Sequence, residues 1–237
     1  MTRLAGQDIA YMLHAVPYKE TSLVVELFCR DHGRLPVVAK GAKRPHSALR
    51  SVLLNFQPIA VRFTGKSEVK TLTQAEWCGA LMPPEGKGLF AGYYLNELLM
   101  HGLGREDPHP ELFDNYTQAL ESLYAGEDLT LCVRRFEIAL LSALGYGIDF
   151  SQDSEGALIS AESEYCWMPE RGWIDAKSVG EDRQRISGRH INALEAGLLS
   201  RESALILKPL TRSLLTNHVS SKGLLSRAWM EQLVKYD

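Results

Sequence analysis

The chain of 237 residues is 45% hydrophobic and 23% charged, a composition typical of globular proteins that excludes a largely disordered chain. No apolar run approaches the roughly 20 residues of a membrane-spanning helix. The first residues also lack the apolar block of a signal peptide, so we expect a cytoplasmic protein.

Charge is distributed unevenly along the chain. The first 80 residues hold 11 Lys and Arg against 6 Asp and Glu, residues 81–180 hold 6 against 17, and residues 181–237 hold 9 against 6. The overall net charge of −3 therefore hides a basic N-terminal part and an acidic middle part. This asymmetry predicts that a basic module meets a polyanion while an acidic body faces elsewhere.

The first 80 residues contain short apolar segments separated by turn signals. A turn at 31–33 and a hairpin-like segment at 64–67 are two of these signals. Strands are predicted at 9–14, 22–29, 34–39, 58–63 and 69–75. Five short strands with a longer excursion after the third fit a closed β-barrel of the OB fold, and an SH3-like barrel fits the same periodicity.

The excursion after the third strand begins in residues 34–50, RLPVVAKGAKRPHSALR. It carries Lys40, Lys43, Arg44 and Arg50, with no acidic residue between positions 34 and 50. A glycine and a proline prevent a strand or a helix from continuing, which predicts a flexible basic loop. Such a cluster of positive charges favours contact with a polyanion backbone, and a solvated loop is the alternative.

After Pro83 and Pro84 the spacing of apolar residues changes from period 2 to period 3.6. We therefore predict an OB-fold DNA-binding domain over 1–80, followed by a mainly α-helical domain over 81–237. The first helices are predicted at 89–103, 111–124 and 129–144, and Gly126 and Gly145 are candidate C-terminal stops.

Residues 149–185 are polar and rich in Ser, Glu and Gly, with one Tyr and two Trp as strong apolar anchors. We expect an excursion from the helical domain here, and a hairpin is one form that it can take. Ser187 is the predicted N-cap of the next helix, and Pro209 is predicted to kink a later one. These C-terminal helices are predicted at 190–199, 202–218 and 224–236.

Motifs for catalysis or metal binding are missing. The segment Gly86-Lys87-Gly88 lacks the spacing and the preceding strand of a phosphate-binding loop, and no GxSxG motif occurs. The seven histidines show no HxxxH or HxH spacing, and the four cysteines form no CxxC pair. We therefore expect no enzyme activity, no cofactor and no metal, and we expect the cysteines to be reduced.

Several sequence blocks match, in order and spacing, the RecO family of bacterial recombination mediators. These blocks are PYKETS, VAKGAKRP and KTLTQAE in the first 80 residues, followed by AGYYLNELL and RRFEIALLSALGYGIDF. The chain resembles this family well over residues 9–150 and loosely in the C-terminal helices. Members of the family have an OB-fold domain followed by a helical domain.

The resemblance implies a non-enzymatic protein that binds single- and double-stranded DNA and anneals complementary strands. It also implies that the protein acts with RecR to help RecA replace single-stranded DNA-binding protein on nucleoid DNA. Some members hold zinc with four cysteines in the excursion after the LGY block. Here Cys166 is the only cysteine in residues 149–185, so we expect no zinc site.

The resemblance also strengthens the prediction that cations of the basic loop and of the barrel strands contact DNA phosphates. Tyr18 and Phe63 are candidates for base stacking, although aromatic residues on strands more often belong to a core. In similar members an Arg of the RRFE block, here Arg134, receives the acidic tail of single-stranded DNA-binding protein. An ion pair within the helix is the alternative role for Arg134. The predicted DNA-binding residues are Arg34, Lys40, Lys43, Arg44, Arg50, Lys66 and Lys70.

Two other functions fit the sequence. In the first, the chain is a protein-only adaptor with incidental DNA affinity, which should vanish at physiological ionic strength. In the second, it is an enzyme whose active site is assembled from residues distant in sequence, and nuclease or nucleotide turnover would support that function.

Overall fold

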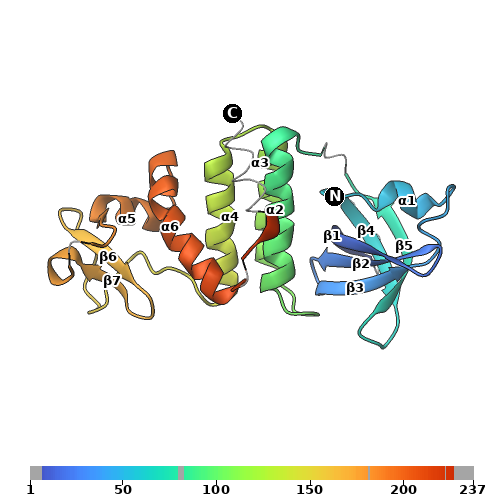
Figure 1. Cartoon of the computed structure of the whole chain (residues 1–237), viewed down its shortest axis with the longest axis horizontal. Coiled ribbons are helices and arrows are strands. Elements are labelled where there is room, and N and C mark those ends of the chain that lie inside the picture. Colours follow the sequence, from blue (N-terminus) through green and yellow to red (C-terminus); the bar gives the residue numbers. More distant parts are fainter. Residues whose placement is uncertain (1–6, 80–82, 181, 222, 227–237) are drawn as a thin grey trace. The chain divides into compact units, whose positions relative to one another are not determined.

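The computed structural model describes residues 7–79, 83–180, 182–221 and 223–226 (Figure 1). The chain folds into two compact units. Unit 1 comprises residues 1–129 and 219–237, and unit 2 comprises residues 130–218. Each unit buries its own set of apolar side chains.

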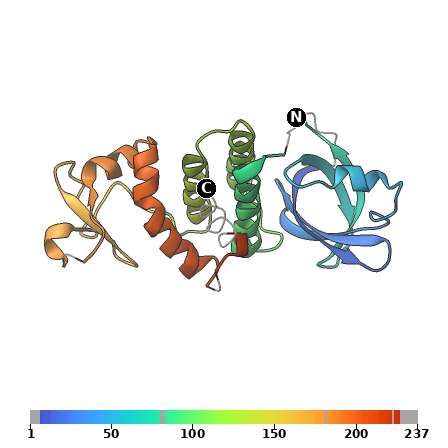
Figure 2. The ribbon, with the colours of Figure 1, turned by 45° about the horizontal axis from the view of Figure 1, so that its top comes forward.

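Unit 1 contains a closed five-stranded barrel, shown in blue and cyan in Figures 1 and 2. Its strand order is β1-β2-β3-β5-β4, closed by the antiparallel pair β1–β4 and by the parallel pair β3–β5. This Greek-key closure is the OB arrangement, so the predicted fold class is confirmed. The strands are β1 (Asp8–Tyr18), β2 (Ser22–Cys29), β3 (Gly33–Ala39), β4 (Pro58–Thr64) and β5 (Lys70–Trp77).

Strand β1 is longer than predicted and continues past the barrel. It pairs with β4 only from Asp8 to Tyr11, whereas it pairs with β2 as far as Tyr18. The distal half of β1 is therefore an edge of the sheet, where Pro17 removes no hydrogen bond that a second neighbour would need. A register shift between Met12 and His14 marks the point at which the strand leaves the barrel.

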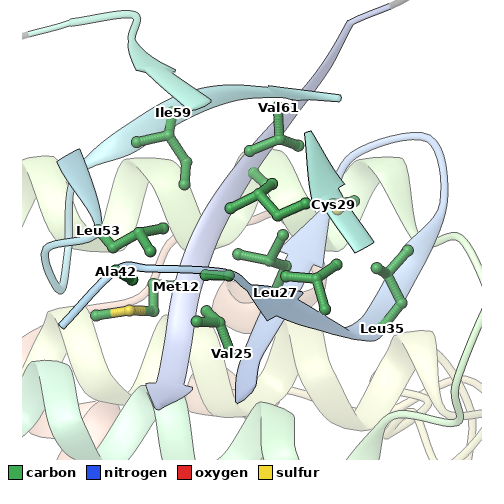
Figure 3. Packing of buried hydrophobic residues seen from close by; sticks show 13 residues of the cluster. Met12, Val25, Leu27, Cys29, Leu35, Ala42, Leu53, Ile59 and Val61 are labelled. Carbon is green, nitrogen blue, oxygen red and sulfur yellow. The ribbon is translucent and has the colours of Figure 1, made fainter. Parts of the chain in front are cut away.

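The core of the barrel is formed by alternate residues of its strands. Val25, Leu27 and Cys29 on β2 are fully buried, and Figure 3 shows them among Ile59 and Val61 of β4. This period of two is the pattern from which the strands were predicted. Complete burial of each such aliphatic side chain contributes roughly 1.5 to 3 kcal/mol, so the alternating pattern fixes the register.

Helices α2 (Gly86–Gly102) and α3 (Pro110–Tyr124) belong to unit 1, and both predicted helices are confirmed. Asn96 of α2 donates from Nδ2 to the Leu13 carbonyl at 3.0 Å and accepts at Oδ1 from the Tyr116 hydroxyl at 2.5 Å. The rings of Tyr116 and Tyr11 pack edge to face, with centroids 5.1 Å apart. Burial raises the pKa of Tyr11 to about 12, as expected for a phenol inside this shared core.

The compact units do not divide at residue 80. Unit 1 extends through α3 because Phe113 and Tyr116 pack on Tyr11 and Phe28 of the barrel. The unit boundaries describe which residues pack together, whereas the predicted domain boundary describes a change in the sequence pattern. The division into 1–80 and 81–237 therefore stays a prediction.

The last described residues also belong to unit 1. The Glu97 carboxylate of α2 accepts from the backbone N–H of Leu225 at 2.8 Å and from that of Ser226 at 2.9 Å. A carboxylate at this place satisfies backbone donors that have no other partner at the start of a helix. The predicted helix at 224–236 lies outside the described residues from position 227 onward.

Gly33, at the predicted turn between β2 and β3, allows a close approach of two backbones. It has a φ of +68°, and a Cβ atom here would lie 2.1 Å from the Asp107 carbonyl oxygen. Beside it, the Glu106 N–H donates to the Arg34 carbonyl at 2.8 Å. A side chain at position 33 would push the 104–107 segment away from β3, so the glycine is required by both sterics and φ.

Unit 2 combines helices with a small sheet. The predicted helices at 129–144 and 202–218 are confirmed, and Ser187 caps α5 by accepting from the Arg189 N–H. Helix α6 continues through Pro209. The helices are α4 (Leu129–Ala143), α5 (Gly188–Glu195) and α6 (Arg201–His218), and the strands are β6 (Glu164–Met168), β7 (Gly172–Asp175) and β8 (Ile186–Ser187).

The polar excursion at 149–185 contains a hairpin, β6–β7, and β8 adds a third strand in the order β7-β6-β8. Trp167 and Trp173 face each other across the hairpin with ring centroids 5.0 Å apart. Trp173 is buried and donates from Nε1 to the Asp149 carbonyl at 2.7 Å. The predicted aromatic anchors therefore form the core of this small sheet.

Candidate nucleic-acid interface

The basic loop, residues 40–50, follows β3 and leads into the short helix α1 (Ala48–Val52). It differs from the flexible arm that we expected, because it is a run of hydrogen-bonded turns. Ala42 is buried in the barrel core (Figure 3), and the Lys43 N–H donates to the Thr21 carbonyl at 2.9 Å. The Arg44 N–H donates to the Gly41 carbonyl at 3.0 Å. The barrel thus holds the loop in place beside the β1–β2 turn.

The four cations of the basic loop are exposed and carry no compensating charge. Among the described residues, none of these side chains forms an ion pair or a hydrogen bond. The cause lies in the sequence, which has no acidic residue between positions 34 and 50. Fixed positive charges without partners create a local positive potential that attracts phosphates. The cations are Lys40, Lys43, Arg44 and Arg50.

Two of the predicted DNA-binding residues are already paired within unit 1. Arg34 lies 3.3 Å from Glu26 and donates from Nε to the Leu103 carbonyl at 3.1 Å. Lys70 lies 2.7 Å from Glu106. Both cationic side chains are only 14% exposed. Their contact with DNA stays a prediction, and binding a phosphate there would require breaking these ion pairs.

Glu26 also binds a cation outside the barrel strands. Arg105 contacts Glu68 and lies 3.1 Å from the Glu26 carboxylate that also binds Arg34. One carboxylate thus holds two guanidinium groups. The Coulomb energy of such a network is larger than that of an isolated surface pair, so these cations tie the 104–107 segment to the barrel.

Lys66 is the remaining predicted cation, and it lies exposed in the turn between β4 and β5. Of the two stacking candidates, Tyr18 is 41% exposed in β1 next to the β1–β2 turn. Phe63 packs against the barrel core and edge-on to the His32 ring, with centroids 5.1 Å apart. OB folds bind oligonucleotides with these two loops and the face between them, so Lys66 and Tyr18 lie where a ligand is expected.

Arg134, the predicted tail-binding residue, is buried in unit 2. It is 4% exposed, it contacts Glu137 and Thr211, and it donates from Nε to the Ala204 carbonyl at 3.2 Å. These contacts match the alternative of an ion pair within the helix, and they leave no exposed guanidinium for a partner. The tail-binding role of Arg134 therefore stays a prediction that its burial does not favour, and its neighbour Arg135 is the exposed one.

The sequence patterns did not reveal an exposed aromatic residue at the end of β5. Trp77 is 56% exposed, although it is a large apolar side chain in a barrel strand. The predicted strand ends at residue 75, so the pattern assigns Trp77 to neither face of the sheet. The register shift in β5 opposite Arg62 and Phe63 then pairs Trp77 with the buried Ile59, so its exposure reflects its place at the end of the strand.

Other candidate chemistry is sparse in the part of the chain that the structure describes. There, no group of three or more His, Cys, Asp or Glu side chains could hold a metal ion. The cysteines are free, and burial raises the pKa of the Cys29 thiol well above its usual value. Within the same residues, no helix has the length and apolar character needed to cross a membrane.

Two family models match the chain almost from end to end. The one described as "Recombination protein O N terminal" matches residues 1–81, and the one described as "Recombination protein O C terminal" matches residues 84–228. The first match contains the barrel and the basic loop. The second contains every described helix from α2 onward.

Relatives described as "DNA repair protein RecO" match along most of the chain. The protein of Azoarcus sp. is 42% identical over 234 residues, which cover 97% of this chain and 96% of the relative. That of Laribacter hongkongensis is 40% identical over 235 residues, which cover 98% of this chain and 96% of the relative. That of Ralstonia nicotianae is 48% identical over 167 residues, which cover 70% of this chain but only 61% of the relative.

Proposed function

The chain belongs to the recombination protein O (RecO) family of DNA repair proteins, and from that premise we propose that it is a DNA-binding recombination mediator. In this role it binds single- and double-stranded DNA and anneals complementary strands. With RecR, it helps to load RecA on DNA coated by single-stranded DNA-binding protein. It does this in the cytoplasm, on nucleoid DNA, and no catalytic step is involved.

The observation that carries this proposal is the set of exposed cations in the basic loop, which have no ion-pair partner in the part of the chain that the structure describes. Each cation that neutralises a phosphate releases condensed counterions, which drives binding without regard to base sequence. The loop is held on the barrel by buried Ala42 and by the Lys43 N–H, so its charges are positioned before DNA arrives. This fixed arrangement lowers the entropy that must be lost on binding.

Annealing follows from contacts that are made to the backbone. When the protein binds phosphates and sugars, the base edges stay available to a complementary strand. Neutralising the phosphates also reduces the repulsion between two strands. Weak DNA contacts suffice if the protein is tethered to coated DNA, since tethering raises the local concentration.

Tethering requires a surface for the acidic tail of single-stranded DNA-binding protein. Because Arg134 is buried, we place this contact at exposed cations of unit 2, with Arg135, Arg183 and Arg189 as candidates. A peptide with a carboxylate end would be held there by charge-assisted hydrogen bonds. Arg134 supports the helix that carries Arg135.

The test is fluorescence anisotropy of labelled single-stranded DNA at several salt concentrations. The loop variant combines Lys40→Glu, Lys43→Glu and Arg44→Glu. Each phosphate contact on a single strand contributes about 0.7 to the slope of log K against log salt, so losing three should lower the slope by about 2. Annealing of complementary strands should slow in parallel.

A matched variant separates the effect of the basic loop from the effect of net charge. Arg171→Glu, Lys177→Glu and Lys208→Glu change the charge by the same amount at exposed positions of unit 2. This variant should keep the salt slope of the wild type. If the loop variant binds and anneals DNA like the wild type, the proposed function is wrong. If wild-type binding vanishes near physiological salt, the protein-only adaptor is supported instead.

A further inference from the structure

Residues 52–56, which follow the basic loop, gather exposed apolar side chains from three elements of unit 1. The Trp77 indole at the end of β5 donates from Nε1 to the Val52 carbonyl at 3.3 Å. Asn55 donates from Nδ2 to the hydroxyl of Tyr93 on α2 at 3.1 Å. Leu54, between these two anchor points, is itself exposed. We call Trp77 and Tyr93, together with the aliphatic Leu54, the aromatic patch.

The exposure of Trp77 has no structural explanation within the barrel. Its strand partner Ile59 is fully buried, whereas 56% of Trp77 is open to solvent. An indole is seldom left so exposed when a core is within reach, and an exposed apolar patch marks a binding surface. Since the hydrogen bond to Val52 satisfies the indole N–H, the apolar ring is what remains to be covered.

The aromatic patch is continuous with the basic loop. Val52, which holds the Trp77 indole, is the last residue of α1, and Arg50 lies on the same short helix with its side chain exposed. An exposed cation and an exposed indole are therefore attached to one short helix. Proteins that bind single strands combine these two features, because the charge follows the backbone while bases stack on aromatic rings.

We propose that Trp77 is a base-stacking residue, which receives a base of single-stranded DNA whose phosphates lie on the basic loop. The inference rests on the proposed function and adds a ligand contact to it. Its ligand is an unpaired base and not a protein side chain, because the neighbouring charge is positive and uncompensated. The bases of a duplex are already stacked, so Trp77 contributes to single-strand binding alone.

The test compares two labelled strands of equal length, an oligothymidine and an abasic strand with the same phosphates and no bases. Trp77→Ala should weaken binding to oligothymidine by about 5- to 150-fold, the fold-change for roughly 1 to 3 kcal/mol per stacked base. The salt slope should stay that of the wild type, since no phosphate contact is lost. Binding to the abasic strand should not change.

Trp77→Phe and Tyr124→Ala serve as controls. The first keeps an aromatic face but loses the hydrogen bond to Val52, so it should bind oligothymidine nearly as well as the wild type. The second removes an exposed aromatic side chain of α3 elsewhere in unit 1 and should bind like the wild type. Thermal unfolding of each variant verifies that it is folded.

Three outcomes would overturn the inference. Trp77→Ala could bind oligothymidine like the wild type, which would leave the patch to a protein partner. Trp77→Ala could lose affinity for both strands equally, or Trp77→Phe could lose as much affinity for oligothymidine as Trp77→Ala. Either result would mean that Trp77 only positions α1. A loop variant that weakens binding while Trp77→Ala does not would leave the proposed function standing, so the two failures are distinguishable.

Discussion

The basic loop of unit 1 and helix α4 of unit 2 both present adjacent cations in the sequence, and the fold treats them in opposite ways. Lys43 and Arg44 lie on the surface with no acidic partner among the described residues, whereas Arg134 is buried against Glu137. In the loop the chain offers no carboxylate nearby, and on the helix it offers one three residues away. A cation is available to a phosphate only where the fold supplies no acid.

This difference predicts a division of labour between stability and binding. Breaking a buried ion pair leaves a charge that water cannot reach, which costs far more than removing an exposed charge. Cations of the loop should therefore affect DNA binding and leave stability unchanged. Arg134 should behave in the reverse way. The following substitutions test this division, beginning with the largest expected effect.

Arg134→Leu should destabilise unit 2 by about 3 to 5 kcal/mol, because the buried Glu137 carboxylate loses the guanidinium that it contacts. Chemical denaturation followed by circular dichroism measures the loss. Adding Glu137→Leu should recover most of it, since an apolar pair of similar volume fills the same space. Arg135→Leu is the matched control at the exposed neighbour and should change stability by less than about 0.5 kcal/mol.

The contrary result for Arg134 would be informative. If Arg134→Leu is as stable as the wild type but no longer binds a peptide with the acidic tail sequence of single-stranded DNA-binding protein, the guanidinium is a partner contact after all. In that case the burial described for α4 does not hold when the partner is present. Loss of stability in Arg134→Leu, together with intact peptide binding by the Arg134→Leu/Glu137→Leu double variant, would confirm a structural role.

Arg34→Gln should cost about 1.5 kcal/mol of stability, because it removes a charge-assisted hydrogen bond to Glu26 and a second bond to the Leu103 carbonyl. The effect is smaller than at Arg134 because Arg105 still pairs with the same carboxylate. The salt slope of DNA binding should equal that of the wild type. A slope lower by about 0.7 would instead show that Arg34 contacts a phosphate.

Most of the fold could be predicted from local patterns. The alternation of residues such as Val25 and Leu27 identified the strands, and apolar spacing identified α2, α3 and α4. What local patterns could not show was how α2 and α3 join the barrel. That contact depends on Asn96 reaching the Leu13 carbonyl 83 residues away, and no period in the sequence reports such a pair.

The candidate site could be predicted only in part, for a similar reason. The basic loop was recognisable because a run without acids cannot pair its cations locally. Lys70 looked equivalent in sequence, but its partner Glu106 is 36 positions away and is brought near by the turn that packs on Gly33. Trp77 was missed because its significance lies in its exposure, which depends on where β5 ends relative to α1.

The smallest expected effect is also the sharpest test of the interface, and it uses single neutral substitutions. Lys43→Gln should lower the salt slope by about 0.7, which is about fivefold in affinity at 0.1 M salt, with no change in stability. Lys177→Gln, at an exposed site of unit 2, should change neither quantity. Lys66→Gln then measures the reach of the interface. If the salt slope falls as much as it does for Lys43→Gln, a single strand runs from the basic loop to the β4–β5 turn. An unchanged slope confines the phosphates to the loop, where the described residues offer the four cations no partner.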